Sequence, residues 1–428
     1  MADFRPLQGW RYDAGKNDFQ KVIAPPYDVI SPAQQERLYE RSRYNCIRLI
    51  LNKIESTDTS TNNRYTRARD VYERWQRDGI LTQEKEPCFY LYRQNFQHPE
   101  NGILLERSAL LGRIKLEPFE KGIIIPHEKT LSRPKEDRKK LLEATNTNFS
   151  PIFGLYQDPR GEVKALLSGA DKEKPLFEAI DDEGVRHRVW VVRDSSQVER
   201  LSQEFGAHKI YIADGHHRYQ TALDHSLEAR KGEGELLSDF VLMALVEFDD
   251  PGLVLLPTHR MVLPYASFPE NPLEALKKHF NVRAIHESPL QASPKSGGND
   301  KSGISFGLVL GKDHYQLTLK DLEAAKREMP QGKPEIWYQF DLNVLAHLIF
   351  AKLWNLPEPE WENALRFTHH MPEAIEAAQS GKAKAAFLIQ APRTRLLQEM
   401  GEAGLLMPQK STYFYPKLAS GLVFYSHK

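Results

Sequence analysis

Short stretches of alternating apolar and polar residues recur along the chain, and segments with helical spacing separate them. Residues 88–96 and 103–116 flank a His-Pro-Glu-Asn-Gly turn, which predicts a hairpin of two antiparallel strands. Apolar positions on one helical face predict a helix over 65–77, and the apolar run 240–248 is short enough for a buried strand. We expect further strands at 45–51, 148–156, 185–192, 209–213, 281–286 and 383–390, and further helices at 195–205, 268–280, 342–354 and 394–402.

This order of elements favours the α+β class, a mixed α/β fold with helices interspersed in a mixed sheet. The chain of 428 residues is long enough for two or three sub-structures. We expect an N-terminal, β-rich α/β region at 1–105, a core at 106–265 and a C-terminal α/β region at 266–428. The last strands, at about 383–428, are expected to complete the functional site. The stretch 288–303, rich in Ser, Pro, Gly and Lys, is expected to be a surface loop.

The charge balance and the cysteine content indicate which binding partners and which cellular location to expect. Lys plus Arg and Asp plus Glu are equal at 58 each, so no global charge attracts the chain to nucleic acid or to an anionic membrane. Only Cys46 and Cys88 occur, without the spacing of a zinc site or of a disulfide framework. The first residues lack a basic and apolar leader, and no apolar run approaches the ~20 residues of a membrane span. We therefore expect a cytoplasmic protein without a nucleic-acid or membrane partner, and a homodimer stays open.

The stretch KIYIADGHHRYQTAL joins a predicted strand to a predicted helix through polar residues. Asp214 ends the strand, and Gly215 permits a close approach of the backbone. The next three residues carry donors at the point where a helix exposes its first amides: His216, His217 and Arg218. Such a corner suits a phosphoryl group, with Asp214 available to magnesium. An isolated Asp-Gly pair would more often be a helix N-cap, but the crowding of cationic side chains behind it favours a site.

A second candidate is the tripeptide Pro126-His127-Glu128, which follows an apolar strand. A carboxylate held in place after a strand and a proline break is what a general base needs, and His127 could tune Glu128. The alternative is a capping or ion-pairing glutamate beside Lys129 and a basic helix. Taken alone, this alternative is the commoner case, because most surface carboxylates have ordinary pKa values.

Two further segments offer cations and hydroxyls. Lys410, Ser411 and Thr412 in MPQKST are residue types that bind phosphate, although the glycines of a Walker A loop are missing. His259 and Arg260 could add a cation at the end of a strand. The alternatives are a plain turn with an exposed lysine and an ordinary strand end. The rigid APPYDVI turn could be purely structural.

Six segments in one order resemble a known family over nearly the whole chain. They are APPYDVI, YNCIRLIL, PHEKT, DGHHRYQTAL, LPTHR and MPQKSTYFYPKLASGLV. The family is the bacterial and archaeal domain of unknown function 1015, whose name implies no reaction. The order of PHE, of DGHHR after a strand and of a late lysine with hydroxyls is also similar to that of the free L-serine kinases. Those kinases have the ParB/sulfiredoxin-like fold, so the resemblance implies a nucleotide-binding core of that kind.

The kinase resemblance implies a role for each motif. Glu128 would act as general base on the acceptor hydroxyl. Asp214 and His217 would complete the catalytic group, and Asp214 would also hold Mg²⁺. The remaining motif residues would bind the phosphates of ATP or ADP: His127, Gly215, His216, Arg218, His259, Arg260, Lys410, Ser411 and Thr412. The chain departs from the kinase pattern in Gln409 and in its long N-terminal region, which leaves the acceptor open.

The leading hypothesis is a small-molecule kinase that moves phosphate from a nucleotide to a hydroxyl acceptor, most simply free L-serine giving O-phosphoserine. Phosphoryl transfer needs positioning, cations around the phosphate and a carboxylate that accepts the hydroxyl proton. The alternative is a non-catalytic nucleotide-binding regulatory protein of the same superfamily, and a third reading is a structural protein with vestigial motifs. The kinase hypothesis expects Glu128, Asp214 and Lys410 to share one cleft.

Overall fold

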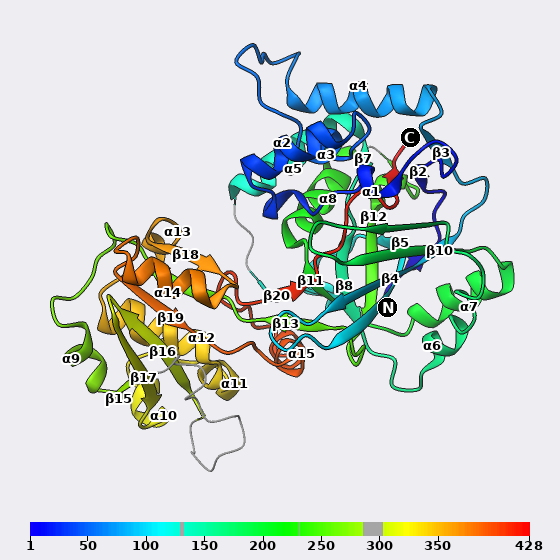
Figure 1. Cartoon of the computed structure of the whole chain (residues 1–428). Coiled ribbons are helices and arrows are strands. Elements are labelled where there is room, and N and C mark those ends of the chain that lie inside the picture. Colours follow the sequence, from blue (N-terminus) through cyan, green and yellow to red (C-terminus); the bar gives the residue numbers. More distant parts are fainter. Residues whose placement is uncertain (129–131, 231, 286–302) are drawn as a thin grey trace. The chain divides into compact units, whose positions relative to one another are not determined.

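The structure is a computed structural model, and it describes residues 1–128, 132–230, 232–285 and 303–428. The chain forms two compact units (Figure 1). Unit 1 comprises Met1–Pro126, Thr130–Val254 and Phe414–Lys428, and unit 2 comprises His127–Lys129 and Leu255–Tyr413. The units interleave along the sequence, which is a different division from the three consecutive regions expected above. That expectation of three regions stays a prediction.

A nine-stranded mixed sheet forms the centre of unit 1. Its strands are β1 (Phe4–Arg5), β4 (Phe89–Gln97), β5 (Leu104–Lys115), β6 (Ile124–Ile125), β8 (Ile152–Tyr156), β9 (Phe177–Ile180), β10 (Arg186–Val192), β11 (Ile210–Asp214) and β12 (Phe240–Glu247). The order is β6-β11-β8-β12-β5-β4-β10-β9, and β1 pairs with β5. Strand β8 runs parallel to β12 and antiparallel to β11, so strand direction is mixed in the middle of the sheet.

Helices cover one face of this sheet. They are α5 (Ser132–Thr145), α6 (Glu162–Leu166), α7 (Ser195–Phe205) and α8 (His216–Ala229). Side chains of these helices share one apolar core with alternate residues of β12, which are Val241, Met243 and Leu245. On the opposite face, the ring of Phe153 lies 5.3 Å from that of Phe414 in the C-terminal segment. Seven of the eight residues of β12 itself are buried, so this strand is covered on both sides, which explains its unbroken apolar run.

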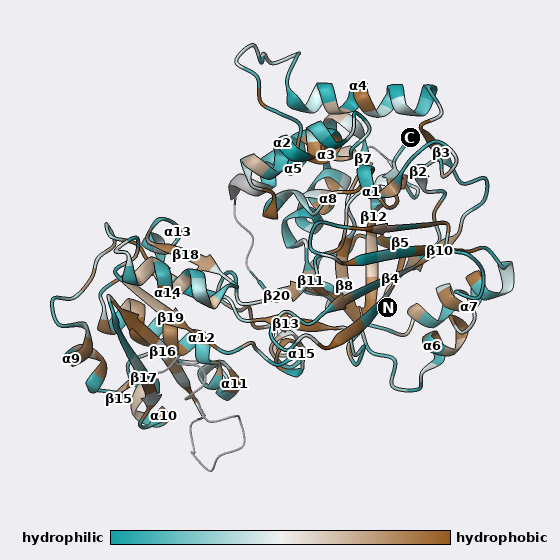
Figure 2. Ribbon diagram, viewed as in Figure 1, coloured by the Kyte–Doolittle hydropathy of each residue, from teal (hydrophilic) through white to brown (hydrophobic). Residues whose placement is uncertain are grey.

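The N-terminal part of unit 1 adds α1 (Phe19–Val22), α2 (Pro32–Arg41), α3 (Ile47–Ile50) and α4 (Arg64–Arg77). Helix α4 lies beside α5 in Figure 1, and Figure 2 shows most of its surface as hydrophilic. Asn63 and Thr66 form a capping box at its start, so the helix predicted over 65–77 is confirmed. Two small antiparallel pairs complete unit 1, β2 (Trp10–Tyr12) with β3 (Leu81–Gln83) and β7 (Thr147–Asn148) with β21 (Tyr425–Ser426).

The strand predicted at 45–51 is wrong, because this segment contains the helical turn α3. The side chain of Asn45 is fully buried and accepts a hydrogen bond from the Ile47 amide at 2.9 Å. It also donates to the carbonyls of Lys21 and Ile23. These tertiary hydrogen bonds fix a turn at Asn45, and they override the strand preference of the residues that follow.

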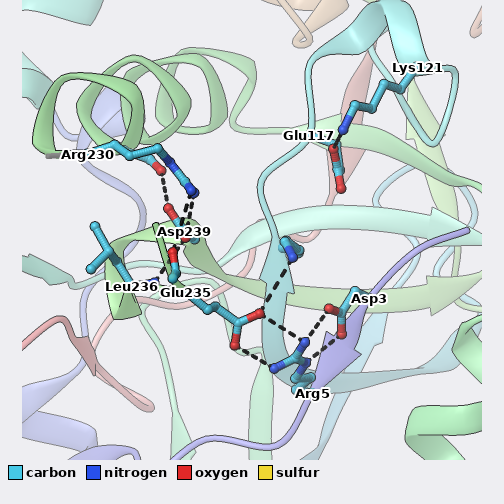
Figure 3. Close-up of polar contacts among 11 residues, drawn as sticks. Asp3, Arg5, Glu117, Lys121, Arg230, Glu235, Leu236 and Asp239 are labelled. Atoms are coloured by element: carbon cyan, nitrogen blue, oxygen red, sulfur yellow. Dashed lines mark hydrogen bonds and ion pairs between the residues drawn. The ribbon is translucent and has the colours of Figure 1, made fainter. Parts of the chain in front are cut away.

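Charged side chains anchor the far end of α8 to the N-terminal strand region (Figure 3). Arg230, which follows α8, donates to Asp239 at 2.7 Å, and Asp239 is 3% exposed. Nearby, Arg5 donates to Asp3 at 2.6 Å and to Glu235 at 2.7 Å. Arg230 thus connects the end of α8 to Asp239, while the beginning of the helix forms the polar corner described below.

Unit 2 contains a six-stranded antiparallel sheet. In sheet order, the strands are β15 (Phe280–Ile285), β17 (Asp313–Leu319), β16 (Ser305–Leu310), β19 (Ala385–Leu388), β14 (His259–Val262) and β18 (Leu365–Thr368). Helix α14 (Met371–Gln379) packs on one face, where Ala374 and Ala378 meet Met261 and Leu388. The other face carries Phe387, whose ring lies 5.0 Å from that of Trp354. Figure 2 colours β16 as strongly hydrophobic, as expected for a strand covered on both sides.

The amphipathic helix predicted at 342–354 is wrong in type. The segment begins with α12 (Asp341–Asn343) and continues as a π-helix, η4 (Val344–Leu353). Six residues of η4 are buried, and they lie around most of its circumference: Val344, Leu345, Ala346, Leu348, Ile349 and Phe350. A helix that is buried on most sides has no need of a polar face. The π-helix also has more residues per turn than an α-helix, so the α-helical spacing used for the prediction does not apply.

Besides the 3-10 helix η5 (Glu358–Glu360), the other described elements of unit 2 are short α-helices and one longer helix near its end. They are α9 (Pro272–Lys277), α10 (Leu322–Lys326), α11 (Glu335–Gln339), α13 (Trp361–Ala364) and α15 (Thr394–Glu402). Strands β13 (Val254–Leu256) and β20 (Tyr413–Tyr415) stand where the chain passes from one unit to the other. Helix α9 is shorter than the predicted 268–280, because Phe280 already begins β15. Apart from Gly303, the predicted loop at 288–303 lies outside the described residues.

The prediction of a mixed α/β fold is confirmed. Both units combine sheets with covering helices, and the large sheet has parallel and antiparallel neighbours. The likeness of the core to the ParB/sulfiredoxin-like fold stays a prediction from the motifs. Among the described residues, the helices are all too short or too polar to cross a membrane.

Candidate functional site

The predicted strand-to-helix corner is present in unit 1, between β11 and α8. The pairing of β11 with β8 shifts register between Ile212 and Asp214, so Ala213 is an extra residue at the strand end. Such a bulge turns the next side chain away from the regular alternation. Gly215 then adopts a φ of +94°, and a Cβ atom there would lie 2.9 Å from the guanidinium of Arg218. Only glycine suits both the left-handed backbone and this close contact.

Asp214 lies between two cations at this corner. It accepts from Arg218 Nη2 at 3.0 Å and from Lys417 Nζ at 3.3 Å, and all three side chains are mostly buried. Arg218 also donates to the carbonyl of Pro151. The N-cap residue of α8 is Gly215 and not Asp214, so the expectation of an N-cap at Asp214 does not match the helix boundary, and the role of Asp214 in a site stays a prediction. Two cations against one carboxylate leave this trio with a net positive charge.

The first turn of α8 carries His216 and His217 at the same corner. His216 is buried and His217 is half-buried. Gly215 at the N-cap has no side chain, and the dipole of a 14-residue helix favours an anion at this end. The corner therefore joins fixed cations to a helix N-terminus, which is a setting that suits phosphate.

Lys417 was not among the predicted site residues, although it lies within the MPQKSTYFYPKLASGLV segment. Arg107 positions the chain just before it, donating to the carbonyl of Tyr415 at 3.1 Å and to that of Pro416. Gln94 donates to the carbonyl of Lys417 itself at 3.0 Å. Arg107 is 1% exposed, and burial lowers its pKa to about 10. Polar residues at inward positions of the apolar strands β4 and β5 are the signal that could have drawn attention to this segment.

In unit 2 the structure brings the PHE and MPQKST motifs into contact. Glu128 pairs as a parallel bridge with Met407, and its Oε1 accepts from the Ser411 amide at 3.1 Å. His127 is buried, and its Nε2 lies 2.9 Å from Thr412 Oγ1. Among the described residues, the second oxygen of Glu128, Oε2, accepts no hydrogen bond. One carboxylate oxygen is thus anchored by the backbone, while the other has no hydrogen-bond donor within the described part of the chain.

The residues of the MPQKST turn have different environments. Lys410 is exposed and has a positive φ of 55°, which points to a tight turn. Ser411 is fully buried, and its hydroxyl donates to the Pro408 carbonyl at 2.5 Å. The Ser411 side chain therefore stabilises the turn, and its amide holds Glu128.

Arg260 and His259 lie buried beside this turn. Arg260 donates to the Lys410 carbonyl at 3.3 Å, and burial lowers its pKa to about 10. His259 is 1% exposed and accepts from the Ile389 amide at 3.2 Å. Burial lowers the pKa of His259 to about 4, so the ring is neutral near pH 7. The sequence did not single out Asp341, whose pKa burial raises to about 6 and whose charge favours the cationic form of Arg260.

The metal assignment rests on Asp214. Across the described ranges, no three His, Cys, Asp or Glu side chains gather closely enough to hold a metal ion. Mg²⁺ is often held by one or two protein carboxylates together with the phosphates of a nucleotide. A single carboxylate between two cations fits an ion that arrives with phosphate, and it does not fit an ion held by the protein alone.

The predicted site residues fall into two clusters. The unit 1 cluster consists of Asp214 to Arg218, with Lys417 added by the structure. The unit 2 cluster consists of His127, Glu128, His259, Arg260 and Lys410 to Thr412. The expectation that Glu128, Asp214 and Lys410 share one cleft stays a prediction.

Fold and clusters together define a mixed α/β protein with a positively charged strand-to-helix corner and an anchored carboxylate. The chain belongs to the family described as protein of unknown function (DUF1015), whose model matches residues 4–343. The resemblance to this family is therefore confirmed. The matched residues include Glu128, Asp214 and Arg260, and they end before Lys410 and Lys417.

Solved structures with some similarity include the following three. A conserved hypothetical protein from Pyrococcus furiosus is 15% identical, with a TM-score of 0.35 over 72% of this chain and 91% of that one. A free serine kinase in complex with AMP is 14% identical, with a TM-score of 0.35 over 71% and 86%. SbnI from Staphylococcus aureus, truncated at its C-terminus, is 11% identical, with a TM-score of 0.36 over 73% and 86%. Scores of this size are too low to transfer an activity, and no curated protein matches the chain.

Proposed function

We propose that this protein is a small-molecule kinase that transfers phosphate from ATP or ADP to a hydroxyl acceptor, with free L-serine as the simplest acceptor. The observation that carries the proposal is the trio of Asp214, Arg218 and Lys417 at the N-terminus of α8. Fixed cations beside the N-terminus of a helix are a setting in which phosphate charge is stabilised. The motif order that resembles the serine kinases supports the same reaction.

In this proposal, the corner binds the phosphates of the nucleotide. Arg218 and Lys417 would turn from Asp214 toward phosphate oxygens, so binding exchanges one ion pair for another. Mg²⁺, when bound with the nucleotide, would neutralise phosphate charge, with Asp214 as its protein carboxylate. His217 stands in the first turn of α8, where it could donate to the transferring group.

Glu128 is assigned the role of general base. The acceptor oxygen attacks the terminal phosphorus, the bond from that phosphorus to the leaving nucleotide oxygen breaks, and the acceptor proton passes to Glu128 Oε2. The hydrogen bond from the Ser411 amide to Oε1 keeps the carboxylate in place during this step. The products are a phosphate monoester and the nucleotide shortened by one phosphate.

The test is an assay of purified protein with Mg²⁺, L-serine and either ATP or ADP. We expect O-phosphoserine by mass spectrometry, and its formation should depend on the nucleotide. A panel of other small alcohols and hydroxy acids extends the test to alternative acceptors. Absence of any phosphorylated product across this panel would contradict the proposal. Nucleotide binding without product would instead favour the non-catalytic regulatory protein.

A further inference from the structure

A small cavity in unit 1 connects the APPYDVI turn, which the proposed function leaves without a role, to the DGHHR corner. Its volume is about 60 Å³, with Tyr27 of the turn and Arg218 of the corner among its walls. Such a volume has room for roughly four water molecules, or for a short organic acid. The cavity is therefore too small for a nucleotide and suits a group of a few atoms.

The charge of the cavity wall is positive. Of the described residues that line it, Arg138 and Arg218 are the charged ones. Arg138 is held by the Ile50 carbonyl at 2.9 Å and by Asp137, which is also paired with Arg64. Like Asp214 at the corner, Asp137 is one carboxylate between two cations. At each of these two places the cations outnumber the carboxylate by one, so the side chains around the cavity carry a net positive charge.

Tyr27 provides a neutral donor at the same place. The guanidinium carbon of Arg138 lies 3.7 Å from the centre of the Tyr27 ring, so the two side chains stack. In the described part of the chain, the Tyr27 hydroxyl makes no hydrogen bond. Burial raises the pKa of Tyr27 to about 12, so the hydroxyl stays protonated near pH 7 and can donate to an anion.

The rest of the wall limits the size and chemistry of an occupant. Leu141, Ile152 and Val241 supply apolar surface, and Asn148 and Thr221 add neutral polar groups. No Asp or Glu is among the described lining residues, so the cavity offers no carboxylate to an ammonium group. The wall therefore discriminates in favour of anionic groups.

We propose that this cavity binds the carboxylate of the phosphate acceptor, so that the acceptors are small hydroxy carboxylic acids, recognised by Arg138 and Tyr27, with Arg218 shared between the carboxylate and the nucleotide phosphates. This inference rests on the proposed kinase function and deepens it. An acid with a hydroxyl group would be anchored beside the corner that holds the phosphates. Selection acts on the carboxylate and not on the amino group, which makes serine one member of a wider acceptor class.

The first test compares three probes that differ in one group. L-serine has both a carboxylate and an ammonium, glycerate has the carboxylate alone, and ethanolamine has the ammonium alone. We expect ligand-observed NMR titration, with and without ADP, to give dissociation constants for L-serine and glycerate within about threefold of each other. Ethanolamine should bind at least about tenfold more weakly, because it lacks the partner of the guanidinium groups. Equal binding of ethanolamine and L-serine, or no binding of glycerate, would overturn the proposal.

The second test uses matched variants. Arg138→Met should raise the dissociation constant for glycerate about tenfold or more, and Tyr27→Phe should raise it about threefold. Arg48→Met and Tyr44→Phe are the controls. Arg48 stacks on Tyr39 and Tyr44 lies under Arg43, and neither is among the described residues that line the cavity. The affinity for nucleotide should stay unchanged in all four, which a merely structural defect would not allow.

The outcomes separate this proposal from the kinase proposal. Arg138 also holds Asp137, so circular dichroism must first show that Arg138→Met is folded; if it is not, Tyr27→Phe and Arg138→Lys decide. Carboxylate binding that depends on Arg138, without any phosphorylated product, would refute the kinase and leave the acid-binding cavity. Phosphoserine formation with glycerate binding unchanged in the variants would refute the cavity and leave the kinase.

Discussion

The two clusters of candidate residues hold their carboxylates in different ways. In unit 1, Asp214 is held by side chains, Arg218 and Lys417, which are cations that an incoming anion could attract. In unit 2, Glu128 is held by a backbone amide of the turn that contains Ser411. A side-chain ion pair can exchange partners when a ligand binds, whereas a backbone hydrogen bond keeps its geometry. The first arrangement suits binding, and the second suits a group that must stay in position.

The largest expected effect is on the carboxylate held by the backbone. Glu128→Gln should lower turnover by about 10²- to 10⁴-fold, because the amide cannot accept the hydroxyl proton. Its carbonyl oxygen can still accept from the Ser411 amide, so nucleotide affinity should stay the same. Single-turnover kinetics and calorimetric titration with nucleotide measure the two quantities. The exposed Glu120→Gln serves as control, and equal activity of both variants would remove Glu128 from the base role.

The next prediction concerns the unit 1 cluster and the buried arginine that holds the chain just before Lys417. Arg107→Met should lower the free energy of unfolding by about 3 kcal/mol, because it leaves buried carbonyls of Tyr415 and Pro416 without a donor. Urea denaturation measures this change. The exposed Arg69→Met should change stability by less than about 0.5 kcal/mol. A similar, small effect of both variants would mean that Arg107 does not hold the segment before Lys417.

Each unit contains a buried histidine whose pKa burial lowers to about 4, His259 in unit 2 and His427 in unit 1. The unfolded chain binds a proton at each of them near pH 6.5, so stability is full above that pH and falls toward pH 4. For His259, near Arg260 and the histidine pair 369–370, the loss between pH 7 and pH 5 should be about 2 kcal/mol.

His259→Gln should therefore reduce the pH dependence of stability, since glutamine can accept from the Ile389 amide without titrating. Urea denaturation at pH 7 and pH 5 measures the difference. His98→Gln is the control, because His98 is only half-buried. An unchanged pH dependence in His259→Gln would mean that this ring does not titrate in the stated range.

The smallest expected effect is on nucleotide affinity, and it distinguishes two lysines of the same C-terminal segment. Lys417→Met should weaken nucleotide binding about tenfold, because Lys417 is fixed beside Asp214 in a mostly buried position. Lys410→Met should weaken it less than about threefold, because Lys410 is exposed and its charge is screened by water. Calorimetric titration with ATP and ADP measures both. The opposite order would reverse the assignment of the phosphate-binding lysine.

Local patterns were sufficient to predict much of the fold. Helix α7 and helix α15 occupy the predicted residues, and the hairpin of β4 and β5 follows the predicted turn. The corner at Gly215 was also predictable, because a glycine between a strand and a helix supplies a positive φ. These features depend on neighbours in the sequence.

Features that depend on distant parts of the chain were not predictable. Asn45 forms a turn through carbonyls more than twenty residues away, and η4 follows from burial on most sides. Lys417 reaches Asp214 across about two hundred residues, and only Arg107 and Gln94 on their strands indicate the segment that carries it. Sequence spacing cannot predict such pairs, because the pairing of distant segments places them together.

The interleaving of the two units has a consequence for synthesis and for truncation. Unit 2 takes three residues, His127–Lys129, from within the stretch that otherwise builds unit 1, and unit 1 takes Phe414–Lys428 from beyond unit 2. On the ribosome, unit 1 therefore cannot finish folding until residues 414–428 have emerged, after all of unit 2. A gene fragment that encodes residues 255–413 lacks Glu128, and one that stops at residue 254 lacks Lys417. Neither unit is therefore encoded by a single continuous segment of the chain.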